Sequence, residues 1–204
     1  MSKRTTGGLM AVLAFAGVSL SAGAQDPRMT PKLDNPSKAA VQAIVDSAKA
    51  QGVPTDPLLD KVKEGLARGA DNAHIVAVVR NLSVELANAQ RVLGANASAD
   101  EIKAGAYALH AGVPAVELGK LKKESGRLRS LANAFTVMAD IVSRGVPVGT
   151  ATNAIRSLVG AGAKDKDIND FQQKVKVDID QGAPPAAAAE TRAKPAPVKP
   201  EDRE

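Results

Sequence analysis

The chain has 204 residues, of which 44% are hydrophobic and only 2% aromatic, and its formal net charge is +5. It contains no cysteine, which excludes disulfides, thiolate chemistry and cysteine-ligated zinc or iron–sulfur sites. The weak positive charge argues against strong nucleic-acid binding. A chain without tryptophan and with one tyrosine also lacks the aromatic surface typical of carbohydrate binders.

Residues 1–24 have the features of a secretory signal peptide. Lys3 and Arg4 give a positive start, residues 8–20 are small or apolar and uncharged, and the small residues Ser-Ala-Gly-Ala end the segment. The apolar run is shorter than the roughly 20 residues that span a bilayer, so we expect cleavage after Ala24. Without Lys3 and Arg4, 25 of the 27 basic residues remain against 22 acidic ones, a net charge of +3. The sequence therefore predicts a periplasmic or secreted protein with no integral membrane span after cleavage.

The phrase Gly-Val-Pro occurs at residues 52–54, 112–114 and 145–147, each time between two alanine-rich amphipathic stretches. Glycine accepts the left-handed conformation that ends a helix, and the apolar residue after it packs back on the last turn. Proline cannot continue that helix, but it fits the first turn of the next one. The phrase therefore predicts helix–corner–helix architecture and carries no chemistry.

The mature chain begins with an extended lead-in, residues 25–37, which contains three prolines. Within it, Asn35 followed by Pro36 predicts a helix start with asparagine as the N-cap. Apolar residues at helical spacing predict a first helix that ends at Gly52 and a second that ends near Gly69. A longer run then predicts the central helix of the fold.

That central helix is expected from about residue 73 to residue 93, a length of about 30 Å. Ser98 and Glu101 form a capping-box signature that begins the next helix, which ends at Gly112. A shorter helix is expected to break at Ser125-Gly126. An apolar stripe from residue 128 to residue 142 predicts another helix, and the two mature phenylalanines, Phe135 and Phe171, are expected in the core.

The hairpin that follows the corner at Gly145 repeats the spacing of the hairpin that follows Gly52. Both have a Gly-Ala pair at the same distance, at Gly69 and Gly162, and with this offset four apolar positions coincide. These are Ile75 with Ile168, Val78 with Phe171, Leu82 with Val175, and Leu86 with Ile179. The correspondence predicts a duplicated helical hairpin; the alternative is that any two hairpins with glycine corners align this well. The irregular spacing of the Gly-Val-Pro phrases argues against a long regular solenoid.

The composition changes after Gly182. Residues 183–204 are rich in alanine and proline and lack apolar periodicity, which predicts a disordered tail with at most a short helix around residues 186–193. The tail is either a solvated end or a contact to cell-wall polymer or a partner groove. Between lead-in and tail, residues 38–182 show no sustained alternation. They predict one all-α domain, a compact bundle of seven or eight helices.

No recognisable catalytic or metal-binding motif is present. His74 and His110 share no motif and are expected to be structural or surface residues. The stretch that starts at Asp165 resembles an EF-hand loop, but its sixth position is Asp170 instead of glycine and its twelfth is Lys176 instead of glutamate. Acidic residues at a helix N-terminus account for that stretch. We therefore predict no metal, no cofactor and no catalytic residue.

Outside the signal peptide, the segment 119–129 has a marked excess of positive charge, with five basic residues and one acid. It is expected to be a solvated surface or, as the functional alternative, a patch for phosphate, lipid head groups or acidic polymers. It has no interleaved aromatic for base stacking, and its Gly-Lys pair lacks the Walker spacing. The residues of this possible anionic-ligand patch are Lys120, Lys122, Lys123, Arg127 and Arg129.

Three functions follow from these features. The preferred hypothesis is an exported, non-enzymatic helical scaffold or binding protein of the bacterial cell envelope, whose partner is another envelope protein or component. The second is a peripheral binder of an anionic polymer or membrane surface through residues 120–129. The third is a cell-wall-acting enzyme, which requires carboxylates that converge from separate helices and a perturbed pKa among them. Nucleic acid is not an expected partner.

Overall fold

A computed structural model describes residues 33–126 and 130–193. Within these ranges the chain forms nine α-helices and no strand, so the all-α prediction is confirmed. The predicted signal, most of the lead-in and residues 194–204 lie outside the described ranges. The helices are α1 (Asn35–Ala50), α2 (Asp56–Ala67), α3 (Asn72–Leu93), α4 (Ala99–His110), α5 (Ala115–Glu124), α6 (Ala132–Ser143), α7 (Val148–Gly160), α8 (Asp165–Asp180) and α9 (Pro185–Ala193).

The Gly-Val-Pro corners have the predicted conformation. Their glycines have φ angles of 70°, 93° and 91°, in the left-handed region that side chains with a Cβ rarely adopt. The N–H of the following valine donates to the carbonyl of the residue five positions earlier, at 2.9 to 3.0 Å, as in a Schellman stop. The valines Val53, Val113 and Val146 are buried. Each corner therefore ends one helix and anchors the turn in the core.

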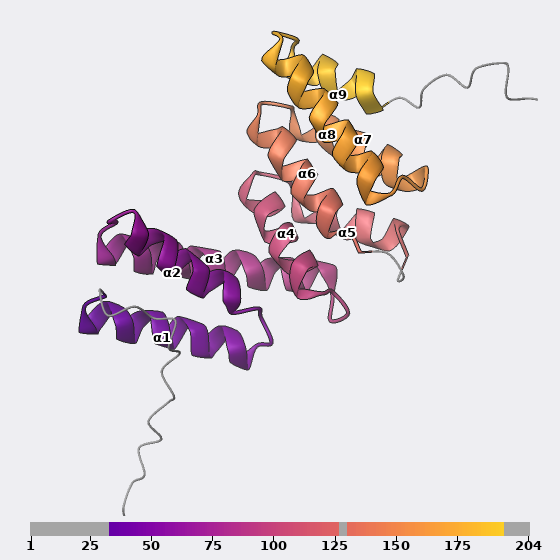
Figure 1. Cartoon of the computed structure of the whole chain (residues 1–204). Coiled ribbons are helices and arrows are strands. Elements are labelled where there is room, and N and C mark those ends of the chain that lie inside the picture. Colours follow the sequence, from indigo (N-terminus) through magenta and orange to yellow (C-terminus); the bar gives the residue numbers. More distant parts are fainter. Residues whose placement is uncertain (1–32, 127–129, 194–204) are drawn as a thin grey trace, which may run out of the picture.

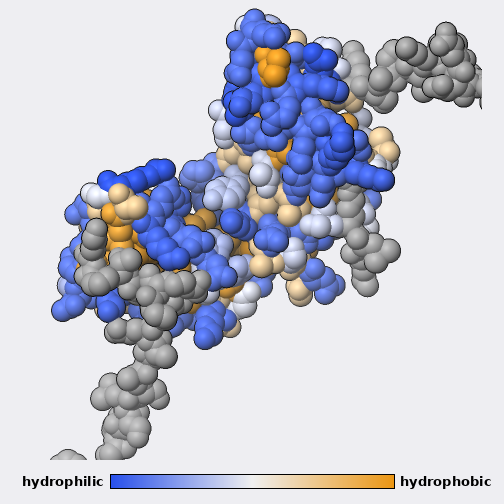
Figure 2. All heavy atoms as spheres, in the orientation of Figure 1, coloured by the Kyte–Doolittle hydropathy of each residue, from blue (hydrophilic) through white to orange (hydrophobic). Residues whose placement is uncertain are grey.

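The helices form two groups, which meet at α3 and α4 (Figure 1). In the first group, α1 and α2 both pack on α3. In the second, α4, α6 and α8 pack one on the next in one layer, and α5, α7 and α9 do so in a second layer. Most of the visible surface is hydrophilic, with hydrophobic patches exposed between the helices (Figure 2). No helix of the described ranges has the combined length and hydropathy needed to cross a bilayer.

Two hydrophobic clusters correspond to these groups. The first contains the buried residues of α1 and α2 with Ile75, Val79 and Leu86 of α3. The second extends from Leu93, at the end of α3, through α4 to α9, and it contains Phe135 and Phe171, as predicted. Because α3 and α4 contribute to both clusters, they join the two parts of the core.

Two glycines inside helices allow close packing. A Cβ at Gly65 of α2 would lie 2.8 Å from Ile75 Cγ1 on α3, and one at Gly105 of α4 would lie 3.0 Å from Leu93 Cδ1. At these two positions the contact with α3 offsets the low helix propensity of glycine. A Cβ at Gly119 would make an ordinary contact of 3.5 Å, so no such reason applies there.

The first helix begins earlier than predicted. Its N-cap is Asp34, not Asn35: the Asp34 carboxylate accepts a hydrogen bond from the Ser37 N–H at 2.8 Å. Asn35 and Pro36 are the first two helical residues, because the fixed φ of proline suits the first turn. The start of the helix therefore lies inside the predicted lead-in, residues 25–37.

The short helix expected within the tail, around residues 186–193, is confirmed. Residues 185–193 form α9, which packs on α7 and α8 and buries Ala188 and Ala189, so it belongs to the helical domain. Alanine has the highest helix propensity, and its small side chain fits between two helices. A corner like those at Gly-Val-Pro precedes the helix, since the Ala183 N–H donates to Asp178 O at 2.9 Å. Within the described residues, the helical part of the chain thus extends 11 residues beyond the predicted boundary at residue 182.

The two similar hairpins have their corner at the same place, but they differ in the length of the second helix, 22 residues in α3 and 16 in α8, and in packing. With the sequence offset, the end of α2 at Ala67 corresponds to the end of α7 at Gly160, and the start of α3 corresponds to that of α8. Of the four paired apolar positions, Ile75 and Ile168 are buried in both hairpins. However, α2 packs on α3, whereas α7 and α8 each pack on α6 and α9. The two hairpins therefore share their corners and lie in different surroundings, and the duplication stays a prediction.

Candidate functional site

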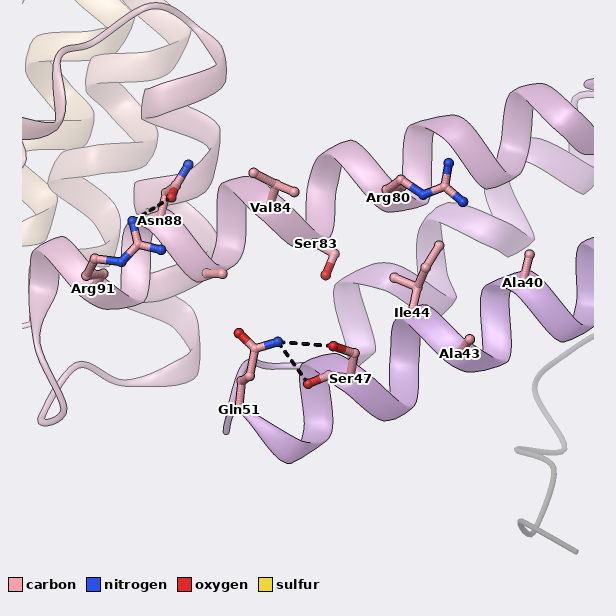
Figure 3. A pocket seen from close by; sticks show the side chains of 11 residues that line it. Ala40, Ala43, Ile44, Ser47, Gln51, Arg80, Ser83, Val84, Asn88 and Arg91 are labelled. Atoms are coloured by element: carbon pink, nitrogen blue, oxygen red, sulfur yellow. Dashed lines mark hydrogen bonds between the residues drawn. The ribbon is translucent and has the colours of Figure 1, made fainter.

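A groove of about 480 Å³ runs between α1 and α3 (Figure 3). Its lining positions recur every three or four residues along each helix, so each helix presents one continuous face to it. On α3 this face lies beside the buried stripe that packs into the core. The lining residues are Ala40, Ala43, Ile44, Ser47 and Gln51 from α1 and its C-cap, and Arg80, Ser83, Val84, Ala87, Asn88 and Arg91 from α3.

The groove has small, apolar and hydroxyl side chains along its middle and an arginine towards each end of its α3 face. Ile44 and Ala87 are half-buried, while Val84 keeps 56% of its surface exposed, although it is a large apolar side chain. Gln51 turns back onto its own helix, where its Nε2 donates to Ser47 Oγ at 3.1 Å (Figure 3). Arg80 and Arg91 lie on α3 at opposite ends of the face.

Neither arginine forms an ion pair with a described residue. Arg91 Nη1 donates to the neutral Asn88 Oδ1 at 2.9 Å, and among the described residues no acidic side chain lines the groove. Asp46, the acidic residue of α1, lies on another face of that helix and accepts a hydrogen bond from Gln42 at 2.9 Å. The groove is therefore a small apolar surface with a positive charge at each end.

The described part of the predicted anionic-ligand patch does not form one basic face. Lys122 turns inward, and its Nζ lies 2.6 Å from Glu101 Oε1 of α4. Lys120 pairs with Glu117 on its own helix at 2.9 Å. Lys123 is exposed and lines, with Lys122, a hollow of about 500 Å³ beside the α3–α4 turn. The other two patch residues, Arg127 and Arg129, lie outside the described ranges.

Glu101 has a structural role that the capping box only partly predicted. Its Oε2 accepts from the Ser98 N–H at 3.0 Å, which confirms the box. Its Oε1 accepts from Lys122 and from the Leu131 N–H, the latter at 3.0 Å. Burial alone would raise the pKa of Glu101, but the hydrogen bonds from Lys122 and the two backbone N–H groups lower it overall. This carboxylate therefore ties the starts of α4 and α6 to α5.

Other carboxylates of the second group are also paired. Glu117 of α5 forms an ion pair with Arg156 of α7, whose Nε lies 3.2 Å from Glu124 Oε2. Asp140 accepts from Arg144 and, across to α8, from Gln172, both at 2.9 Å. Where a pKa shift of a described carboxyl group is resolved, the shift is downward. These groups are thus held ionised by their partners.

The two histidines occupy separate places. His110 Nδ1 lies 2.9 Å from Glu85 Oε1, so this pair joins the end of α4 to α3. His74 is in the first turn of α3, about 16 Å along the helix from residue 85. The described residues contain no group of three or more histidine, aspartate and glutamate side chains that would hold a metal ion.

The EF-hand-like stretch forms the start of α8. Asp167 accepts from the Lys164 N–H at 2.8 Å, and Asp170 pairs with Lys166 at 2.8 Å. These acidic side chains bind the free N–H groups of a helix start and a neighbouring lysine, which is the explanation that the sequence favoured.

Sequence reasoning did not identify the groove between α1 and α3. The residues that line it do recur at helical spacing beside the core stripe. They are Ala40, Ala43 and Ser47 on α1, and Arg80, Ser83, Val84 and Ala87 on α3. Helical spacing gives the face of each helix but not which two faces lie together. Comparisons of the chain with protein-family models, with curated proteins and with solved structures find no match.

Proposed function

We propose that this protein is an exported, non-enzymatic helical scaffold of the cell envelope that binds another protein through the groove between α1 and α3. The observation that carries the proposal is a large apolar side chain, Val84, left exposed among the residues that line this groove. An apolar side chain left 56% exposed beside a groove of about 480 Å³ suits contact with a second macromolecule. Export rests on residues 1–24, and the expected mature N-terminus is Gln25.

The basic segment 120–129 gives the weaker alternative. Of its three described lysines, Lys122 neutralises the buried Glu101 and Lys120 pairs with Glu117. A ligand that recruited either lysine would have to break an ion pair. Of the three, Lys123 alone has no described ion pair, and one lysine contacts fewer anionic groups than binding of a charged polymer requires.

The enzyme alternative is also weaker. A general acid near neutral pH needs a raised pKa, but the interactions around Glu101, Glu117 and Asp140 lower theirs. Each of these carboxylates has a cationic partner and joins parts of the helical stack. Their positions are explained by the fold without a reaction.

Because the chain has no cysteine, one introduced thiol labels one site. A photocrosslinker on V84C, in the groove, would be compared with the same label on V116C and V177C, which replace valines that are 59% and 47% exposed. After photolysis in an envelope extract, we expect one discrete adduct at position 84 and none at the two control positions. Equal adducts at all three positions, or none at position 84, contradict the proposal.

Export is tested separately. We expect the protein in the periplasmic or secreted fraction, with Gln25 as its first residue by N-terminal sequencing. A protein found in the cytosolic fraction with residues 1–24 still attached would contradict this part of the proposal and leave the groove unaffected.

A further inference from the structure

The charges at the ends of the groove identify the kind of partner that fits it. Arg80 and Arg91 lie on one face of α3 together with Val84 and Ala87, at the spacing of a straight helical stripe. Along the helix axis they are about 16 Å apart, or about three turns. Both are exposed, and no described carboxylate pairs with either of them. Their charges are available to a bound molecule.

The floor of the groove is built for close approach by a rod. Ala40, Ala43 and Ser47 on one side face Ser83 and Ala87 on the other, and such small side chains let a third backbone come near. On the other faces of α3, helices already occupy the equivalent positions, since α1, α2 and α4 all pack on it. A helix fits between two parallel ridges in the way that the helices of this fold pack on each other.

We propose that the groove binds an acidic amphipathic α-helix of another protein. The helix places small apolar residues on the groove floor and on Val84, and two carboxylates about three turns apart on Arg80 and Arg91. Each arginine then gains the carboxylate partner that it lacks within the described chain. This inference rests on the proposed function and adds the chemistry of the partner.

The probe is a displayed library of amphipathic helices about four turns long. Their apolar face is fixed as alanine and leucine, and the remaining positions vary among glutamate, lysine and serine. The library is selected on the mature protein and, in parallel, on the R80E/R91E variant. We expect the first selection to enrich glutamate at positions about three turns apart and the second to enrich lysine there. Enrichment of lysine by the unmodified protein, or the same sequences from both, overturns the proposal.

Selected acidic peptides are then measured in solution. We expect their affinity to fall with salt and to drop about tenfold or more in R80E/R91E, because like charges then face each other. The matched control is K103E/K123E, which reverses two exposed lysines outside the groove that have no described ion pair, and should change the affinity little. An equal loss in both double variants would show that net charge, not the groove, attracts the peptide, and would overturn the proposal.

Two further measurements would reveal other occupants of the groove. If residues 194–204 fill the groove, a chain that ends at Ala193 binds the selected peptide more tightly than the full chain. If a second copy fills it, the protein dimerises and R80E/R91E abolishes the dimer. Either result overturns the acidic partner helix. A position-84 crosslink that R80E/R91E does not weaken keeps the scaffold function and rejects this partner chemistry.

Discussion

The two ends of the molecule are held together by different interactions. In α4–α9, ion pairs connect separate helices, whereas in α1–α3 the described pairs with lysine or arginine all lie within α2 and its C-cap, from Asp60 to Arg68. The one described pair that α3 makes with another helix is Glu85 with His110 of α4. The connecting pairs are Lys122–Glu101 between α5 and α4, Arg156–Glu117 between α7 and α5, and Arg192–Asp178 between α9 and α8. The second group therefore uses several of its charges to join helices, and in the first group Arg80 and Arg91 have no described acidic partner.

This difference separates structural charges from available ones. An ion pair that joins two helices already has its function in the fold, so Lys122 and Arg156 are poor candidates for ligand binding despite their charge. Arg80 and Arg91 contribute to no such connection among the described residues. We call α4–α9, whose helices are joined by ion pairs, the self-paired region, and α1–α3 the open region.

The largest losses of stability are expected from the apolar core of either region. Phe135 in α6 and Leu58 in α2 are both fully buried. Phe135→Ala should cost about 3–5 kcal/mol and Leu58→Ala about 2–5 kcal/mol in unfolding free energy, through lost burial and a cavity. Because α3 and α4 belong to both clusters, urea unfolding followed by circular dichroism should remain one transition. Two separate transitions would show that the regions fold independently.

Removing the buried carboxylate should affect only the self-paired region. Glu101→Ala leaves Lys122 and the Leu131 N–H without their partner, with an expected loss of about 3 kcal/mol. The matched change in the first region is Glu64→Ala. It breaks surface ion pairs with Lys61 and Arg68 and should have little measurable effect on stability. Urea midpoints of both variants provide the measurement. Equal losses would remove the distinction between the two kinds of ion pair.

The same carboxylate gives the stack a pH dependence. The folded state lowers the pKa of Glu101 below its ordinary value of 4.5, so its stabilising contribution is present above that pH and is lost as pH falls through the folded pKa. The wild type should therefore lose more stability than Glu101→Gln between neutral pH and acid below 4.5. Parallel curves of unfolding free energy against pH would contradict the assigned hydrogen bonds.

The sequence predicted the corners better than the contacts. Glycine, valine and proline act on neighbouring backbone, so Gly52, Gly112 and Gly145 identified helix ends without knowledge of the rest of the fold. The capping box at Ser98 was recognised for the same reason. In contrast, the partners of Glu101 on α5 and before α6 are 21 and 30 residues away, and no local pattern indicates them.

The gaps in the prediction have the same cause. The sequence suggested the short helix at residues 186–193, but not that it packs on α7 and α8, because buried alanines barely register in a hydrophobic pattern. The basic segment was identified by its local charge, whereas the partner of Lys122 lies on another helix. The groove depends on which faces of α1 and α3 lie together, and helical spacing does not give this.

Close packing in the first region predicts an unusual response to an added methyl group. Gly65→Ala places a Cβ 2.8 Å from Ile75 Cγ1, so the α2–α3 contact must shift. The expected overpacking cost of about 1–3 kcal/mol exceeds the helix-propensity gain of about 1 kcal/mol. Gly119→Ala in α5 is the control, since its Cβ has ordinary contacts and should stabilise by up to about 1 kcal/mol. Stabilisation by both changes, measured in urea, would mean that α2 and α3 are less tightly packed.

The smallest change in unfolding free energy is expected at the two arginines of the groove, Arg80 and Arg91. Arg80→Ala and Arg91→Ala should each change the unfolding free energy by no more than about 0.5 kcal/mol, because neither side chain is buried or paired with a described carboxylate. Arg156→Ala, in the self-paired region, removes the partner of Glu117 and should cost more. Urea unfolding of the three variants, at equal salt, separates the classes. A loss at Arg80 or Arg91 as large as that at Arg156 would show that the groove arginines hold the fold together, and a role for them in capturing an acidic helix would then lose its basis.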